Sequence, residues 1–130
     1  MHEAPEELKS HIAARARLLE EHFAKGDIQA LVGNFYAPDA LAPLVSGGES
    51  AVIGRAAIAT LFEGLVAQFS AIRQVPLTIR TDTETAYEIS NAYFTPRQGG
   101  DEVPFRYLAV WRRCDDFWRV EADFFAPGQV

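Results

Sequence analysis

VPFRYLAVWRRCDDFWRVEADFF, residues 103–125, has the patterning of strands, with a period of two that is clearest over Arg119–Asp123. The alternation falls into two runs, Val103–Arg113 and Phe117–Phe125, which the polar triplet Cys114-Asp115-Asp116 separates. A period of two is typical of strands that bury one face, and so short a loop makes two strands antiparallel neighbours. The stretch therefore predicts a β-hairpin.

The same alternation continues upstream of this hairpin. It covers Val75–Thr81 and Thr85–Thr95, which are separated by Asp82-Thr83-Glu84, and the polar turn Gln98–Asp101 follows. Short loops between successive strands predict an antiparallel meander of four long strands.

Earlier in the chain the apolar residues recur at helical spacing. We expect a first helix over Glu6–Lys25, ended by Gly26, and a short second helix with Asp27 as N-cap and Ile28, Leu31, Val32 and Phe35 as its buried stripe. Gly54 begins a third helix that continues to about Phe69. Helices first and strands afterwards indicate an α+β domain whose helices cover one face of the sheet.

The segment between the second and third helices is ambiguous. Pro38 and Asp39 predict a turn, and residues 40–45 and 51–53 could each form a short strand, with Ser46-Gly47-Gly48 as the turn between them.

Composition bounds the class of protein. The 130 residues suit one domain, and 48% hydrophobic with 23% charged residues is the balance of a soluble globular protein. The net charge of −6 argues against nucleic acid as a partner, since a polyanion requires a basic face. No apolar run approaches the roughly 20 residues that span a bilayer, so we expect no membrane partner.

Cysteine and histidine usage points to the cytoplasm and away from a metal. Cys114 is the single cysteine, which permits no internal disulfide, and the acidic start of the chain is unlike a secretory signal. His11 and His22 would lie about 16 Å apart along one helix, too far to share an ion. Because no glycine-rich phosphate loop is present either, we expect no metal and no cofactor.

Several local patterns, in this order, resemble the SnoaL-like branch of the nuclear transport factor 2-like superfamily. They are Gly26-Asp27 with FYAPDA at 35–40, VIGRAAI at 52–58, Ala86-Tyr87-Glu88, YLAVWRR at 107–113, and Trp118-Arg119-Val120 with Asp123 beyond. The resemblance implies a cone-shaped α+β barrel, with three N-terminal helices packed in a strongly curved antiparallel or mixed sheet and an apolar pocket at its open end. It also implies a homodimer. The superfamily holds isomerases, cyclases, dehydratases, hydrolases and non-catalytic association domains, so it fixes no activity.

The predicted strand register assigns the two faces of the sheet. If the turns centre near Gly99 and Cys114–Asp115, Glu88 lies opposite Trp111 and Trp111 opposite Trp118. The more apolar face, expected to look toward the helices, then carries Glu88, Ser90, Ala92, Tyr107, Ala109, Trp111, Trp118, Val120, Ala122 and Phe124. The other face carries Asp123 among mixed residues such as Ile89, Leu108 and Val110, and it suits a dimer interface.

Three residues are candidates for catalysis. Glu88 is the single carboxylate on the inward face in this register, and a carboxyl group buried among aromatic rings suits a general acid or base. The alternative for Glu88 is an ion pair with Arg73 or Arg80. Tyr107 could donate a hydrogen bond to a ligand carbonyl or be a core tyrosine. Asp123 stands where some polyketide-cyclase relatives carry a catalytic aspartate, but the register places it outward, so it is the second choice.

Seven further residues are candidates for binding a ligand, with core packing or capping as the alternative for each. They are Trp111, Tyr36, Phe23, His22, Ser90, Trp118 and Phe124. His22, near the end of the first helix, could also serve there through the helix dipole alone.

Two functions remain open from the sequence. The first is a homodimer, joined through the outer sheet face, that binds a small apolar or amphipathic molecule and performs acid–base chemistry on it through Glu88. The second is a non-catalytic binding or association module, which would tolerate Glu88→Leu.

Overall fold

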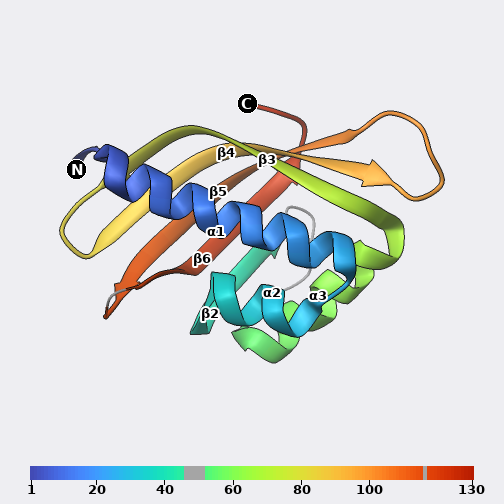
Figure 1. Ribbon diagram of the computed structural model, residues 1–130, viewed down its shortest axis with the longest axis horizontal. Coiled ribbons are helices and arrows are strands. Elements are labelled where there is room, and N and C mark those ends of the chain that lie inside the picture. The colour runs from blue at the N-terminus through green and yellow to red at the C-terminus, as the bar shows by residue number, and fades with distance from the viewer. Residues whose placement is uncertain (46–51, 116) are drawn as a thin grey trace.

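The computed structural model describes residues 1–45, 52–115 and 117–130 (Figure 1). In chain order its elements are β1 (His2–Glu3), α1 (Glu6–Lys25), α2 (Ile28–Phe35), β2 (Tyr36–Val45), α3 (Gly54–Gln68), β3 (Phe69–Thr81), β4 (Thr85–Pro96), β5 (Val103–Cys114) and β6 (Phe117–Pro127). This is the expected α+β class, with the helices early in the chain and the long strands after them.

Capping residues set the end of α1 and the start of α2. Gly26 closes α1 with a left-handed φ of 72°, which glycine adopts without steric cost. The side chain of Asp27 then caps α2, accepting a hydrogen bond from the N–H of Ala30 at 3.2 Å. The predicted bounds of α1 are confirmed.

The sheet has six strands in the order β1-β3-β4-β5-β6-β2. Strands β3 to β6 form the predicted antiparallel meander, and β2 adds to β6 in parallel, which makes the sheet mixed. Figure 1 shows α1 lying across one face of the sheet, with α2 and α3 near one of its ends. No helix in the described ranges is both long and apolar enough to cross a membrane.

The strand predictions were wrong in three places. The turn expected at Pro38 and Asp39 lies within β2, whose pairing with β6 is irregular between Tyr36 and Leu41 and so accommodates a proline. Strand β3 begins directly after α3, at Phe69 rather than at Val75, and β1 was not predicted. Two short strands were expected at residues 40–45 and 51–53. The first is part of β2, and Ile53 of the second makes an isolated bridge with Leu41. The expected turn Ser46-Gly47-Gly48 and Ala51 lie outside the described residues.

The register between β4 and β5 differs from the prediction by two residues. Glu88 pairs with Ala109 and Ser90 with Tyr107. Because a shift of two keeps every side chain on its face, the predicted inward residues of these two strands do face inward, and Glu88 is 2% exposed.

A β-bulge changes the faces along β6. Val120 pairs with Trp111, but Ala122 already pairs with Val110, so Glu121 is an extra residue in β6. Beyond it the alternation is displaced by one position, and Asp123 lies opposite Ala109 on the inner face. The prediction of an outward Asp123 was therefore wrong, because its exposure is 7%.

The same bulge overturns the predicted place of Phe124. Its side chain is 44% exposed on the outer face, and Phe125 takes the inner position opposite Tyr107. Ala122, also predicted inward, pairs with the outward Val110, and Trp118 pairs with Arg113 rather than with Trp111.

Helix α1 is tied to the backbone of β3 at one residue, Gln74. The guanidinium of Arg17 donates a hydrogen bond to the backbone carbonyl oxygen of Gln74 at 3.1 Å. The backbone N–H of Gln74 in turn donates one to the carboxylate of Glu20 at 2.9 Å. Arg17 and Glu20 also pair with each other at 3.0 Å. These contacts fix the helix over the strand whose residues form one wall of the candidate site.

Candidate functional site

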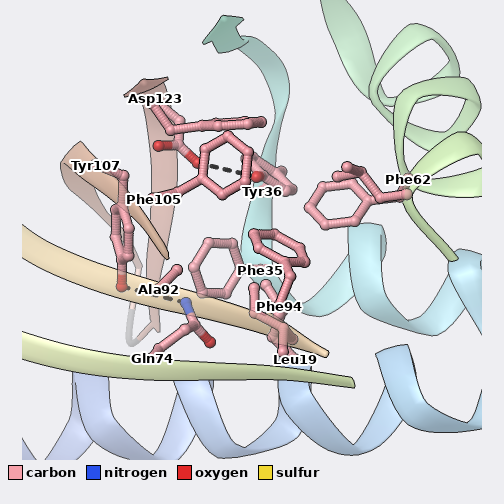
Figure 2. Close-up of a pocket in the computed structure, with 13 residues that line it drawn as sticks. Leu19, Phe35, Tyr36, Phe62, Gln74, Ala92, Phe94, Phe105, Tyr107 and Asp123 are labelled. Carbon is pink, nitrogen blue, oxygen red and sulfur yellow. Dashed lines mark hydrogen bonds between the residues drawn. The ribbon is translucent and has the colours of Figure 1, made fainter. Parts of the chain in front are cut away.

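A cavity of about 40 Å³ lies between the helices and the inner face of the sheet. Every element except β1 contributes to its wall. The lining residues, all drawn in Figure 2, are Leu19, Phe35, Tyr36, Phe62, Leu65, Ile72, Gln74, Ala92, Phe94, Phe105, Tyr107, Asp123 and Phe125. Aromatic and aliphatic side chains predominate, and Leu65, Ile72, Phe105 and Phe125 are half-buried, so the rim toward solvent is apolar.

Asp123 is the carboxyl group of this cavity. Its Oδ2 accepts a hydrogen bond from the hydroxyl of Tyr36 at 3.0 Å, whereas Oδ1 has no donor among the residues that the structure describes. Burial raises the pKa of Asp123 to about 7, against the lowering effect of the Tyr36 hydrogen bond, and the charge of Glu88 raises it further. The backbone N–H of Phe124 also lowers this pKa, although it makes no hydrogen bond to Oδ1.

Tyr36 holds Asp123 in position. The tyrosine is 1% exposed, and burial together with the charge of Asp123 raises the pKa of its hydroxyl well above the ordinary value. The phenol therefore keeps its proton and remains the donor in this pair. A carboxyl group with one fixed oxygen and one unpaired oxygen can bind or exchange a proton at the second.

Glu88 has a different environment, in which both oxygens are occupied. Oε2 accepts hydrogen bonds from Ser90 at 2.6 Å and Tyr107 at 3.1 Å, and Oε1 accepts one from the indole N–H of Trp111 at 3.0 Å. Arg73, one predicted ion-pair partner, binds Glu102 at 2.8 Å instead, and Arg80 makes no bond to Glu88. Three neutral donors thus compensate the buried carboxylate.

The two carboxyl groups face different spaces. Glu88 lies at a second hollow of about 400 Å³ between α1 and β3, whose rim includes Lys9, Arg17 and Arg73. Gln74 lines both hollows, and its amide nitrogen donates to the hydroxyl of Tyr107 at 3.2 Å. Gln74 and Tyr107 therefore connect the Glu88 network with the Asp123 cavity.

The comparison with family models decides the family. Residues 16–121 match the model described as a SnoaL-like domain. The chain belongs to the SnoaL-like domain family. None of the curated proteins compared matches it.

Solved structures resemble this SnoaL-like domain in fold. It is similar to a ketosteroid isomerase-like protein from Erwinia carotovora atroseptica, with a TM-score of 0.73 and 16% identity over 93% of this chain and 96% of that one. A protein of unknown function with a cystatin-like fold from Nostoc punctiforme gives 0.77 and 16%, over 98% and 96%. A nuclear transport factor 2-like protein with a cystatin-like fold from Novosphingobium aromaticivorans gives 0.74 and 20%, over 92% and 80%. Identities this low show a shared fold alone.

Three of the predicted site residues line the cavity of this SnoaL-like domain: Tyr36, Tyr107 and Asp123. Ser90 is fully buried and serves Glu88. Phe23 and Trp111 are core residues, each with 0% exposure, packed edge to face against Phe62 and Phe35 respectively.

The remaining predicted ligand contacts lie elsewhere. His22 is half-buried in the last turn of α1, where its carbonyl oxygen accepts from the N–H of Asp27. Trp118 borders a separate surface hollow beside His11, and Phe124 points away from the helices.

Gln74 is the polar residue of this cavity that sequence reasoning missed. The predicted strand began one residue later, at Val75, so Gln74 was assigned to no face. Extending the strand upstream to Ile72 would have placed Ile72 and Gln74 on one face with Pro76. Nothing else in the local sequence distinguishes this glutamine.

Proposed function

We propose that this SnoaL-like domain binds a small, largely apolar molecule in the aromatic cavity and exchanges a proton with it through Asp123. The observation that supports this proposal is the buried carboxyl group of Asp123, which has one unpaired oxygen and a pKa raised to about 7. A group that titrates near neutral pH can both accept and return a proton at little cost.

The surroundings of Asp123 suit an acid–base step. Ionised, Oδ1 would take a proton from a C–H or O–H group of the ligand, while the hydroxyl of Tyr36 continues to hold Oδ2. The apolar wall would exclude water and strengthen this transfer. Glu88, the residue first predicted for this role, has three donors on its oxygens and stays a predicted catalytic residue of the neighbouring network.

A carbon-acid exchange assay tests the proposal without knowledge of the natural ligand. Cyclopentanone in deuterated buffer exchanges its α-hydrogens slowly, and ¹H NMR follows the loss of signal. We expect the protein to accelerate exchange, with a rate that rises as Asp123 ionises through pH 7. Asp123→Asn should lower the protein-dependent rate by about 100-fold or more, the usual range for loss of a general base.

The matched control for this assay is Asp101→Asn. Asp101 is exposed in the turn between β4 and β5, and its variant should keep the wild-type rate. Equal rates for the wild type and Asp123→Asn would contradict proton transfer by Asp123.

A non-catalytic association module is the second candidate. The cavity, about 40 Å³, is far smaller than the ~300–1,000 Å³ of pockets that hold drug-sized ligands. On this alternative the outer sheet face performs the function. If no small molecule tested binds in the cavity, that result would favour the association module.

A further inference from the structure

The hollow between α1 and β3 has the size of a small-molecule site. Its volume is about 400 Å³, against about 40 Å³ for the aromatic cavity, and lies within the ~300–1,000 Å³ that is usual for ligand pockets. Both elements supply apolar walls, namely Ile12, Ala13 and Ala16 of α1 and Val75 and Ile79 of β3. The hollow therefore suits a small molecule with an apolar body.

The side-chain oxygen of Gln74 is an unused acceptor beside this hollow. Tyr107 donates its single proton to Glu88, so toward Gln74 it can only accept, and the Gln74 group that faces it is the NH₂. Figure 2 shows the oxygen on the other side, turned toward Leu19 of α1. Gln74 is 6% exposed and lines the hollow, and no group in the part of the chain that the structure describes donates to this oxygen. A buried acceptor without a partner costs free energy, so an O–H or N–H donor on the ligand is favoured.

The mouth of the hollow is positively charged. Arg17 and Arg73, which are exposed, and Lys9, which is half-buried, all line it. Each is paired with a carboxylate, but none of these partner carboxylates is a lining residue of the hollow. Glu88, the carboxylate that does line it, is 2% exposed and already accepts three hydrogen bonds. An anionic group at the mouth would thus meet guanidinium and ammonium donors, which bind carboxylates well.

We propose that the hollow between α1 and β3 is a second binding site, which takes a small organic acid with an apolar body. Its carboxylate would bind the cations at the mouth, and an O–H or N–H group on its body would donate to the side-chain oxygen of Gln74. The site is separate from the Asp123 cavity and does not depend on proton transfer there. It makes Gln74 a specificity-determining residue, because its oxygen distinguishes acids that carry a donor from acids that do not.

Three probes of nearly equal shape separate the two polar contributions. p-Hydroxyphenylacetate has both the carboxylate and the donor, p-methylphenylacetate lacks the donor, and p-ethylphenol lacks the carboxylate. Binding is followed by ¹H–¹⁵N NMR near neutral pH, where the carboxylate is ionised and the phenol is not. We expect the signals of Ala13 and Val75 to shift, and p-hydroxyphenylacetate to bind about tenfold more tightly than either other probe. Added salt should weaken binding of the two acids and leave p-ethylphenol unchanged.

Ala13→Phe tests the location without altering the buried hydrogen bonds. Ala13 is exposed and lines the hollow, so a phenyl ring there should occupy part of the space while the fold is kept. We expect p-hydroxyphenylacetate to bind this variant about tenfold more weakly or less. Ala14→Phe is the matched control: Ala14 is exposed on the same helix but does not line the hollow, and its variant should bind as the wild type does.

Gln74→Met removes the amide oxygen at similar length. The variant should bind p-hydroxyphenylacetate no more tightly than p-methylphenylacetate, while its affinity for p-methylphenylacetate stays within about twofold of wild type. Gln98→Met, in the exposed turn between β4 and β5, is the control and should keep the wild-type order of affinities.

Four results would overturn the inference. They are equal affinity of the wild type for the two acids, equal affinity for p-hydroxyphenylacetate and p-ethylphenol, unchanged binding by Ala13→Phe, and failure of all three probes to shift the signals of Ala13 and Val75. Shifts confined to Phe94 and Phe105 would likewise refute this site, because these residues line the aromatic cavity alone of the two. Exchange of cyclopentanone that depends on Asp123 rescues none of these outcomes, so the two proposals fail separately.

Discussion

At the scale of single residues, the two buried carboxyl groups are distinguished by their hydrogen bonds. Glu88 accepts three and Asp123 accepts one. The sequence could indicate that Glu88 is buried, because its face follows from alternation. It could not indicate how many donors meet each oxygen, because these come from Ser90, Trp111 and Tyr36 on three different strands.

Replacing Glu88 by leucine should strongly destabilise the protein. Three buried donors, on Ser90, Tyr107 and Trp111, would lose their acceptor, at a cost of about 3–5 kcal/mol in the free energy of unfolding. Urea unfolding measures the loss, and Glu63→Leu at an exposed position of α3 is the control. A Glu88→Leu variant as stable as the wild type would show that these hydrogen bonds contribute little.

Asp123 should make the protein less stable as the pH rises toward neutrality. Its pKa is raised from 3.8 to about 7, so between these values the folded state binds more protons than the unfolded state. The free energy of unfolding then falls from about pH 4 to pH 7, by on the order of 4 kcal/mol, and is level above. Glu102 and Asp39, whose pKa values ion pairs lower, act at the acidic edge of this window, and His11, whose pKa burial lowers, acts within it; all three raise stability as the pH rises, opposite in sign to Asp123.

Unfolding by urea at a series of pH values checks this sign. Asp123→Asn should remove the fall in stability between pH 4 and 7, since the amide does not titrate. A slope that persists in Asp123→Asn would assign the effect to another group.

At the scale of elements, alternation and capping residues predicted α1, α2 and the four long strands, with errors at their ends that are largest at the start of β3. The bulge at Glu121 was not predicted, because the local sequence Val120-Glu121-Ala122 alternates as an ordinary strand does. A bulge depends on how the whole partner strand is paired, which no short window of sequence reports. One extra residue was enough to exchange the predicted places of Asp123 and Phe124.

Deleting Glu121 should close the bulge and leave Asp123 in the cavity. Without this residue, the pairs of Trp111 with Val120 and of Val110 with Ala122 become successive regular pairs, and Asp123 stays opposite Ala109. We expect the carboxyl carbon of Asp123 to titrate near pH 7 by ¹³C NMR, as in the wild type. Titration near pH 4 would show that the deletion turns Asp123 toward solvent.

At the scale of the whole molecule, the outer face of the sheet carries exposed apolar side chains. Leu108 and Phe124 are 41% and 44% exposed, and they border a shallow hollow together with Ile89 and Ala126. We propose that a second copy of the chain covers this face, since exposed apolar side chains gathered on one face are typical of protein interfaces.

Sedimentation velocity of Leu108→Glu tests the proposed dimer. A charge at the centre of an apolar contact should shift the wild-type dimer to monomer. Leu77→Glu, at a position of β3 that is 51% exposed, is the control and should leave the dimer intact. A wild type that sediments as a monomer would rule out this interface.

The tie between α1 and Gln74 bears on aggregation. An uncovered strand edge offers free N–H and C=O groups onto which a strand of another molecule can add. At Gln74 of β3, Glu20 and Arg17 already occupy both groups, so an incoming strand would first have to displace an ion pair and lift the helix. The ion pair between Arg17 and Glu20 thus also protects this edge of the sheet against the addition of strands from other molecules.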